Sequence, residues 1–213
     1  MLDFPNVDGE NTPNTKNEFP SEERRMSRET TLSQAILGRE TLLYKALLVL
    51  GGSVFIAVSA QVSIPMIPVP ITLQTLAILM VGFAFGSRLG ALTALVYLAE
   101  GFMGLPVFAN GANGAAFAGP TAGFLLGFVP MAYLAGLASE GGLAKGLIGT
   151  AVSAVAISAL LYIPGVLFLA TFLSLDLSTA FSAAAAPFLL GDFVKSILAA
   201  LIVTGAWASL RKS

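Results

Sequence analysis

The sequence predicts an all-α membrane protein, a bundle of six transmembrane helices. Apolar residues make up 56% of its 213 residues and charged residues only 11%, whereas about 25% of a soluble domain is charged. The charges are also unevenly distributed: residues 1–46 hold six of the eleven Lys and Arg and eight of the twelve Asp and Glu. The remainder of the chain is dominated by apolar runs of helical length, which favours membrane insertion.

The first 42 residues differ in composition from the rest. Residues 1–28 are rich in Asn, Glu, Pro, Ser and Arg, which is typical of disordered segments, and residues 30–42 are expected to form a short amphipathic lead-in helix. We interpret 1–42 as a largely disordered cytoplasmic tail and 43–210 as the six-helix transmembrane domain.

Six apolar runs are candidates for membrane helices, for which a bilayer core needs roughly 20 apolar residues each. They span residues 43–60, 71–86, 88–103, 120–138, 144–170 and 187–208. The second and third are short and are separated only by Gly86-Ser87-Arg88, which predicts a helical hairpin. The fifth contains Pro164-Gly165, where we expect a kink or an early end.

Positive charges predict the orientation of the bundle. The loops 61–70, 104–119 and 171–186 contain no Lys or Arg. Apart from Lys195, which lies inside the sixth helix, every Lys and Arg falls in the tail, at the very start of the first helix, at alternate turns or at the carboxyl end. By the positive-inside rule, both termini are expected in the cytoplasm and the protein in the cytoplasmic (inner or plasma) membrane.

Composition excludes several classes of function. There is no Cys and no His, which removes disulfides, thiolate metal sites and imidazole acid–base chemistry. We see no nucleotide-binding motif and no nucleophile–base pair, so we predict neither an enzyme nor a cofactor or metal. A net charge of −1 gives no reason to expect a nucleic-acid partner.

The strongest candidate for a functional site is the pair Asp192 and Lys195. They lie near the external end of the sixth helix, and a spacing of three residues places them on one face. Each charge inside a membrane helix costs about 2.5–3.5 kcal/mol on insertion scales, so such residues usually serve a function. The alternative is an ion pair that only fixes helix packing.

The external loop at 104–119 is a second candidate. Asn110 and Asn113 bring amide donors and acceptors, and Thr121 follows Gly119-Pro120 at a predicted helix start, where free N–H groups favour an anion. A plain flexible turn explains these residues equally well.

Weaker candidates lie on the first three helices. Thr72 and Gln74 follow a proline-rich external segment and would line a cavity, although helix capping and packing explain them at least as well. Glu100 lies near the external end of the third helix, where hydration is the alternative. Ser53 and Ala57 form a small-xxx-small pattern that indicates either internal packing or contact with a partner protein.

Several of these segments together resemble a known family. They are Ile64-Pro65, Val69–Thr75, Arg88–Ala91, Gly104–Ala109, Gly119–Phe128 and Gly191–Lys195. In this order and spacing, from about residue 43 to 210, the sequence resembles the biotin transporter family, the substrate-binding S components of energy-coupling-factor (ECF) transporters.

The resemblance implies high-affinity capture of biotin from outside, with a transmembrane T component and two ATPase subunits as partners. Whether these partners are dedicated, shared or dispensable is left open by the sequence. It places substrate binding in 43–210 and matches the family's Asp and Lys to Asp192 and Lys195. Ser53 and Ala57 correspond to the face on which S components meet the T component. One alternative is an S component for another small vitamin. The other is a channel or structural membrane protein, and the buried Asp and Lys argue against this second alternative.

Biotin fits the candidate residues in two orientations. In one, Asp192 accepts from the ureido N–H groups, Lys195 donates to the ureido oxygen, and the carboxylate meets the 110–113 loop or Thr121. In the other, the carboxylate lies on Lys195. The sequence leaves both open.

Overall fold

The fold is that of a computed structural model of the chain, which describes residues 31–32 and 41–210. Within residues 41–210 the α-helices are α3 (Leu42–Gln61), α4 (Gln74–Phe85), α5 (Ser87–Phe102), α6 (Ala122–Glu140), α7 (Leu147–Phe172), α8 (Leu177–Ala184) and α9 (Leu189–Leu210). The short elements are the strands β1 (Ser63–Ile64) and β2 (Ile71–Thr72) and the 3-10 helices η2 (Ala109–Gly111), η3 (Gly114–Ala118) and η4 (Leu143–Lys145).

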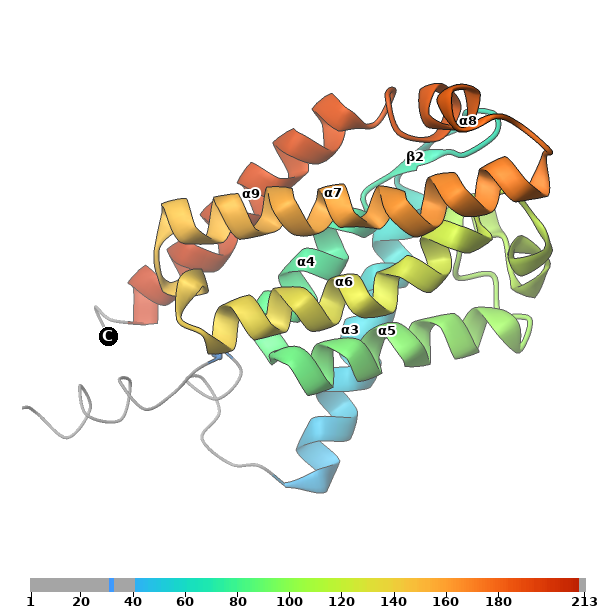
Figure 1. The fold of residues 1–213 in the computed structure, drawn as a ribbon. Helices are drawn as coiled ribbons and strands as arrows, with labels where there is room; N and C mark the ends of the chain where they lie inside the picture. Colours follow the sequence, from blue (N-terminus) through green and yellow to red (C-terminus); the bar gives the residue numbers. More distant parts are fainter. Residues whose placement is uncertain (1–30, 33–40, 211–213) are drawn as a thin grey trace, which may run out of the picture.

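The helices pack into one bundle with α6 at its centre. α6 contacts α4, α5 and α7, and α9 packs against both α4 and α7. Figure 1 shows β2 and α8 at one end of the bundle, whereas the α6–α7 connection and the carboxyl end of α9 lie at the other. The connections predicted as external therefore gather at one end.

All six predicted helices are present, with small differences at their ends. α4 begins at Gln74 and not at 71, because Ile71 and Thr72 pair with Ile64 and Ser63 in an antiparallel hairpin. Four helices (α3, α6, α7 and α9) are long and apolar enough to cross a membrane, and α4 is a shorter apolar helix of 12 residues. The protein is thus an all-α membrane protein.

All three predicted external loops contain regular structure that the sequence does not predict, including η2 and η3 in 104–119. The segment 171–186 holds α8, whose first turn is capped by Asp176. Ser178 and Thr179 donate both side-chain and backbone hydrogen bonds to this carboxylate, and these bonds lower the pKa of Asp176. The segment 61–70 carries β1 and the hairpin turn.

Pro164 does not end its helix. Of the two outcomes expected there, a kink or an early end, the early end is wrong. α7 continues to Phe172. Beside the proline lies Gly123 of α6, where an added Cβ would collide with the Pro164 backbone oxygen. The glycine therefore allows α6 and α7 to approach closely.

The tail predicted at 1–42, with its lead-in helix at 30–42, lies almost entirely outside the described residues. Of its described residues, Leu32 is buried in the main hydrophobic cluster of the bundle. Thr31 is also buried, and its methyl group lies beside the α4–α5 turn at Gly86.

Candidate binding site

A cavity of about 350 Å³ lies under the β1–β2 hairpin and the 105–119 loop. Its walls come from the hairpin, the loop, α4, α6, α7 and α9. The lining residues are Val69, Pro70, Thr72, Gln74, Thr75, Phe108, Ala109, Asn110, Ala112, Ala116, Gly119, Pro120, Thr121, Phe124, Leu125, Phe128, Leu161, Tyr162, Phe188, Asp192 and Lys195. Most are apolar, and the polar ones cluster, as in a typical small-molecule site.

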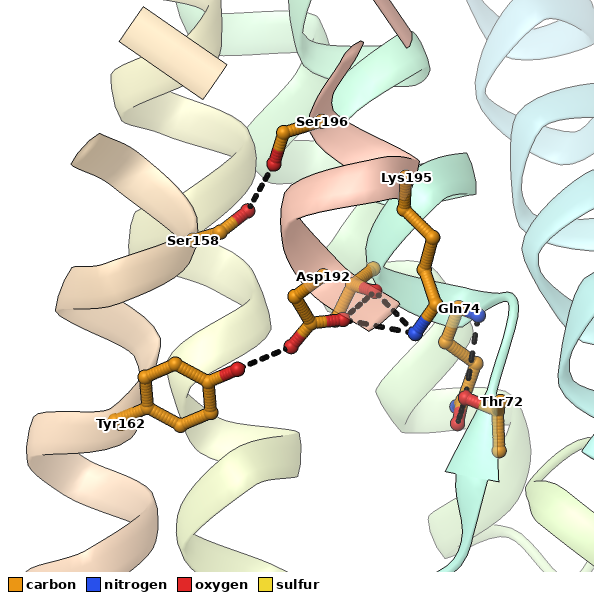
Figure 2. Close-up of polar contacts among 8 residues, drawn as sticks. Thr72, Gln74, Ser158, Tyr162, Asp192, Lys195 and Ser196 are labelled. Carbon is orange, nitrogen blue, oxygen red and sulfur yellow. Dashed lines mark hydrogen bonds and ion pairs between the residues drawn. The ribbon is translucent and has the colours of Figure 1, made fainter. Parts of the chain in front are cut away.

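The carboxylate of Asp192 is at the centre of the buried polar cluster. Its Oδ1 accepts from Lys195 Nζ at 2.8 Å and from Thr75 Oγ1 at 3.0 Å, and its Oδ2 accepts from Tyr162 OH at 2.6 Å. Figure 2 shows Asp192 between Tyr162 on one side and Lys195 on the other. Both charged residues are buried, so the hydrogen bonds offset the cost of removing the charges from water.

The ammonium of Lys195 makes a second contact within this cluster. Its Nζ lies 3.3 Å from Thr75 Oγ1. One turn further along the helices, Ser158 and Ser196 are hydrogen-bonded at 3.1 Å and join α7 to α9 (Figure 2). The predicted pair is therefore tied to both neighbouring helices, α4 and α7.

Thr72 and Gln74 line the cavity and begin a chain of hydrogen bonds. Thr72 Oγ1 donates to Gln74 Oε1 at 2.9 Å, and Gln74 Nε2 donates to the Tyr97 hydroxyl at 2.7 Å. Tyr97 in turn donates to the Val107 carbonyl oxygen at 3.0 Å. The chain fixes the start of the 105–119 loop relative to α4 and α5.

Asn110 and Thr121 also line the cavity, whereas Asn113 is not among the lining residues. Asn110 is exposed and adopts a left-handed backbone (φ 58°), and its Oδ1 accepts from Ser63 Oγ at 2.6 Å. Asn113 instead caps η3, where its side chain accepts from the Ala115 N–H. Helix α6 starts at Ala122, directly after Thr121.

Glu100, Ser53 and Ala57 lie away from the cavity. Glu100 faces α3, where its Oε1 accepts from Ser53 Oγ at 2.8 Å. Ser53 is fully buried, and Ala57 packs partly buried against the core. In the described chain this small-residue face is thus turned toward α5 and the bundle interior.

Tyr162 and the aromatic walls of the cavity are not among the residues predicted from the sequence. Tyr162 is buried on α7 and bonds directly to Asp192, although 30 residues separate the two in sequence. Phe124, Phe128 and Phe188 supply apolar surface. One signal for Tyr162 was available: a buried tyrosine hydroxyl usually needs a polar partner.

Comparison with known proteins supports the same architecture. The profile of the BioY family matches residues 27–212. The biotin transporter BioY of Thermotoga maritima is 38% identical over 69% of this chain and 86% of the relative. That of Rhizobium etli is 38% identical over 66% of this chain and 79% of the relative.

A solved structure is also similar. It is the S-component for biotin from an ECF-type ABC transporter, which aligns with a TM-score of 0.69 and 26% identity over 82% of this chain and 96% of that chain. Since the family profile covers most of the sequence and the fold agrees with an S component, this chain belongs to the BioY family.

Proposed function

We propose that this chain binds biotin in the cavity and takes it up across the cytoplasmic membrane as the S component of an ECF-type transporter. The relatives that it matches are named biotin transporters, which agrees with the expectation that the chain is not an enzyme. The observation that carries the proposal is the hydrogen-bonding capacity left on the buried Asp192–Lys195 pair.

That capacity follows from the geometry. A carboxylate has about four lone-pair sites. Within the described residues, both sites on Asp192 Oδ1 are used by Lys195 and Thr75, and one of the two on Oδ2 by Tyr162. Lys195 has three N–H donors, of which two point to Asp192 and Thr75. The pair therefore offers one acceptor and one donor to a ligand.

An adjacent acceptor and donor complement an N–H beside a C=O, which is the pattern of a cyclic urea. The ureido ring of biotin presents this pattern. A carboxylate has only acceptors, so at this position it would face the remaining lone pair of Asp192 Oδ2 and be repelled. The geometry therefore favours the first of the two orientations, with the ureido ring at the buried end.

In this orientation the carboxylate of biotin lies at the exposed rim of the cavity. Asn110 is at that rim. Its Oδ1 accepts from Ser63, and its amide nitrogen is a separate donor that would meet the carboxylate. Thr121 lies at the start of α6, where the helix dipole also favours an anion. The apolar ring and chain of biotin would pack on Phe124, Phe128 and Phe188.

As an S component, the chain would be energised by a transmembrane T component and two ATPase subunits, with 43–210 as the substrate-binding domain. Both termini would be cytoplasmic, and the cavity would open to the outside. The roles of Asn113 and Glu100 as substrate contacts stay predictions. The same holds for Ser53 and Ala57 as contacts with the T component.

Isothermal titration of the detergent-purified chain with biotin tests the proposal. We expect saturable binding that falls by about ten- to a hundredfold in Asp192→Asn and in Lys195→Ala, because each variant weakens or removes a ligand hydrogen bond to a charged group, worth about 1.5–3 kcal/mol. Tight binding retained in both variants would contradict the site, and binding of a different vitamin in a competition panel would contradict the substrate.

A further inference from the structure

Gln61, the last residue of α3, connects that helix to the loop over the cavity. Its Nε2 donates to the Phe108 carbonyl oxygen at 3.1 Å, and its Oε1 accepts from the Gly111 N–H at 3.1 Å. A second contact of Nε2, with the Ala57 carbonyl oxygen at 3.2 Å, holds the amide against its own helix. The side chain thus clamps both ends of a short turn.

The clamped turn presents Asn110 to the cavity. Asn110 and Gly111 have consecutive left-handed backbones, with φ of 58° and 71°, a conformation that costs free energy for a residue other than glycine. Local bonds from Gly111 N to Phe108 O and from Phe108 N to Ala112 O close the turn. None of these local bonds ties the turn to a helix, whereas Gln61 does.

We infer that Gln61 is a positioning residue for the carboxylate of the ligand. By fixing the turn at 108–111 on the end of α3, it holds the Asn110 amide nitrogen where it meets that carboxylate, while Ser63 holds the amide oxygen. The inference rests on the proposed function, because it concerns the end of biotin opposite the ureido ring.

The test compares biotin with biotinol, in which a hydroxymethyl group replaces the carboxylate. In Gln61→Met, which keeps the length of the side chain but removes its hydrogen bonds, biotin affinity should fall about tenfold, the scale of two modest hydrogen bonds. Biotinol affinity should change less than twofold. Gln61 is exposed, so the substitution leaves the core intact, which thermal unfolding of each variant checks.

Two further variants sharpen the test. Gln61→Glu can still accept from Gly111, but it turns an anionic oxygen toward the carbonyl oxygens of Phe108 and Ala57 and adds a negative charge near the ligand carboxylate. We therefore expect a loss at least as large as in Gln61→Met and again confined to biotin. Ser59→Ala is the matched control, since the Ser59 hydroxyl donates to Phe55 O within the same helix, and it should bind both compounds as the wild type does. The double variant Gln61→Met/Asn110→Ala should bind biotin no more weakly than Asn110→Ala alone.

Equal weakening of biotin and biotinol in Gln61→Met would overturn the inference, as would additive effects in the double variant. If the wild type binds biotin and Gln61→Met binds it equally tightly, the inference about Gln61 is refuted while the proposed function stands. A wild-type chain that binds neither compound removes the proposed function and this inference with it.

Discussion

At the buried end of the cavity, the carboxylate of Asp192 is shared among donors from three helices. Thr75 belongs to α4, Tyr162 to α7 and Lys195 to α9. A charge in this position is stable only while its partners remain, because an uncompensated buried charge is costly. The same three donors determine which lone pair of the carboxylate is left for a ligand.

Removal of the Tyr162 hydroxyl tests that role. In Tyr162→Phe, Asp192 loses a 2.6 Å hydrogen bond, and hydrogen bonds to charged groups are worth about 1.5–3 kcal/mol. That energy belongs to the stability of the fold, because the bond is present with or without ligand. Biotin affinity, measured by titration calorimetry, should fall by roughly tenfold, because the released carboxylate no longer holds its free lone pair toward the ligand. The matched control is Tyr133→Phe, since Tyr133 on α6 is 43% exposed; if both variants bind as the wild type does, the hydroxyl has no part in ligand binding.

Single residues differ in how far the sequence predicts them. Asp192 and Lys195 are predictable because two charges in an apolar helix are costly without a purpose. Tyr162 and Gln61 are not, because an aromatic within an apolar run and a glutamine at a helix end are both ordinary, and their partners are 30 and 47 to 50 positions away. Glu100 is a different case. Its position near the external end of its helix could be predicted, but the direction of its side chain could not, because that depends on the rotation of α5, which points Glu100 at α3.

At the scale of elements, the approach of α4 to α6 depends on Gly82. A Cβ added there would lie 2.5 Å from the Ala132 carbonyl oxygen and 2.6 Å from the Ala135 Cβ, so the two helices would have to separate. Because α4 carries Gln74 and Thr75 into the cavity, such a shift would also reach the binding site.

Alanine substitution separates this packing role from helix propensity. Gly82→Ala should lower the free energy of unfolding by about 1–3 kcal/mol, the usual cost of overpacking. Gly51→Ala on α3, where no atom lies within 4 Å of the added Cβ, should leave stability unchanged or raise it slightly, because alanine favours helix. Thermal unfolding in detergent measures both, and equal midpoints for the two variants would refute the packing argument.

Length decides which elements the sequence predicts. The six apolar runs are each long enough for hydropathy to reveal them, and all six are helices in the structure. α8 has only eight residues and the strands two each, so neither hydropathy nor periodicity distinguishes them from a loop. The hairpin forms because it is packed by tertiary contacts: Val69 lies in a cluster with Tyr162 and Phe188.

Over the whole molecule, the distribution of charge and the arrangement of the ends agree. The β1–β2 hairpin, the 105–119 loop and α8 contain no Lys or Arg and lie around the cavity or pack beside it. Lys145 is in η4, at the α6–α7 connection, which Figure 1 places at the same end of the bundle as the carboxyl end of α9. The positive-inside rule therefore predicts that the cavity opens away from the cytoplasm.

Cysteine labelling tests this orientation directly, because the chain has no native cysteine. Ser182→Cys places an exposed thiol on α8 at the cavity end, and Gly146→Cys places one at the α6–α7 connection, where no atom lies within 4 Å of an added Cβ. A membrane-impermeant maleimide should label the first variant in intact cells and the second only after permeabilisation, and both thiols should react in detergent. The reverse pattern would put Lys145 outside and the cavity inside, and a receptor that captures its ligand from the exterior would then be ruled out.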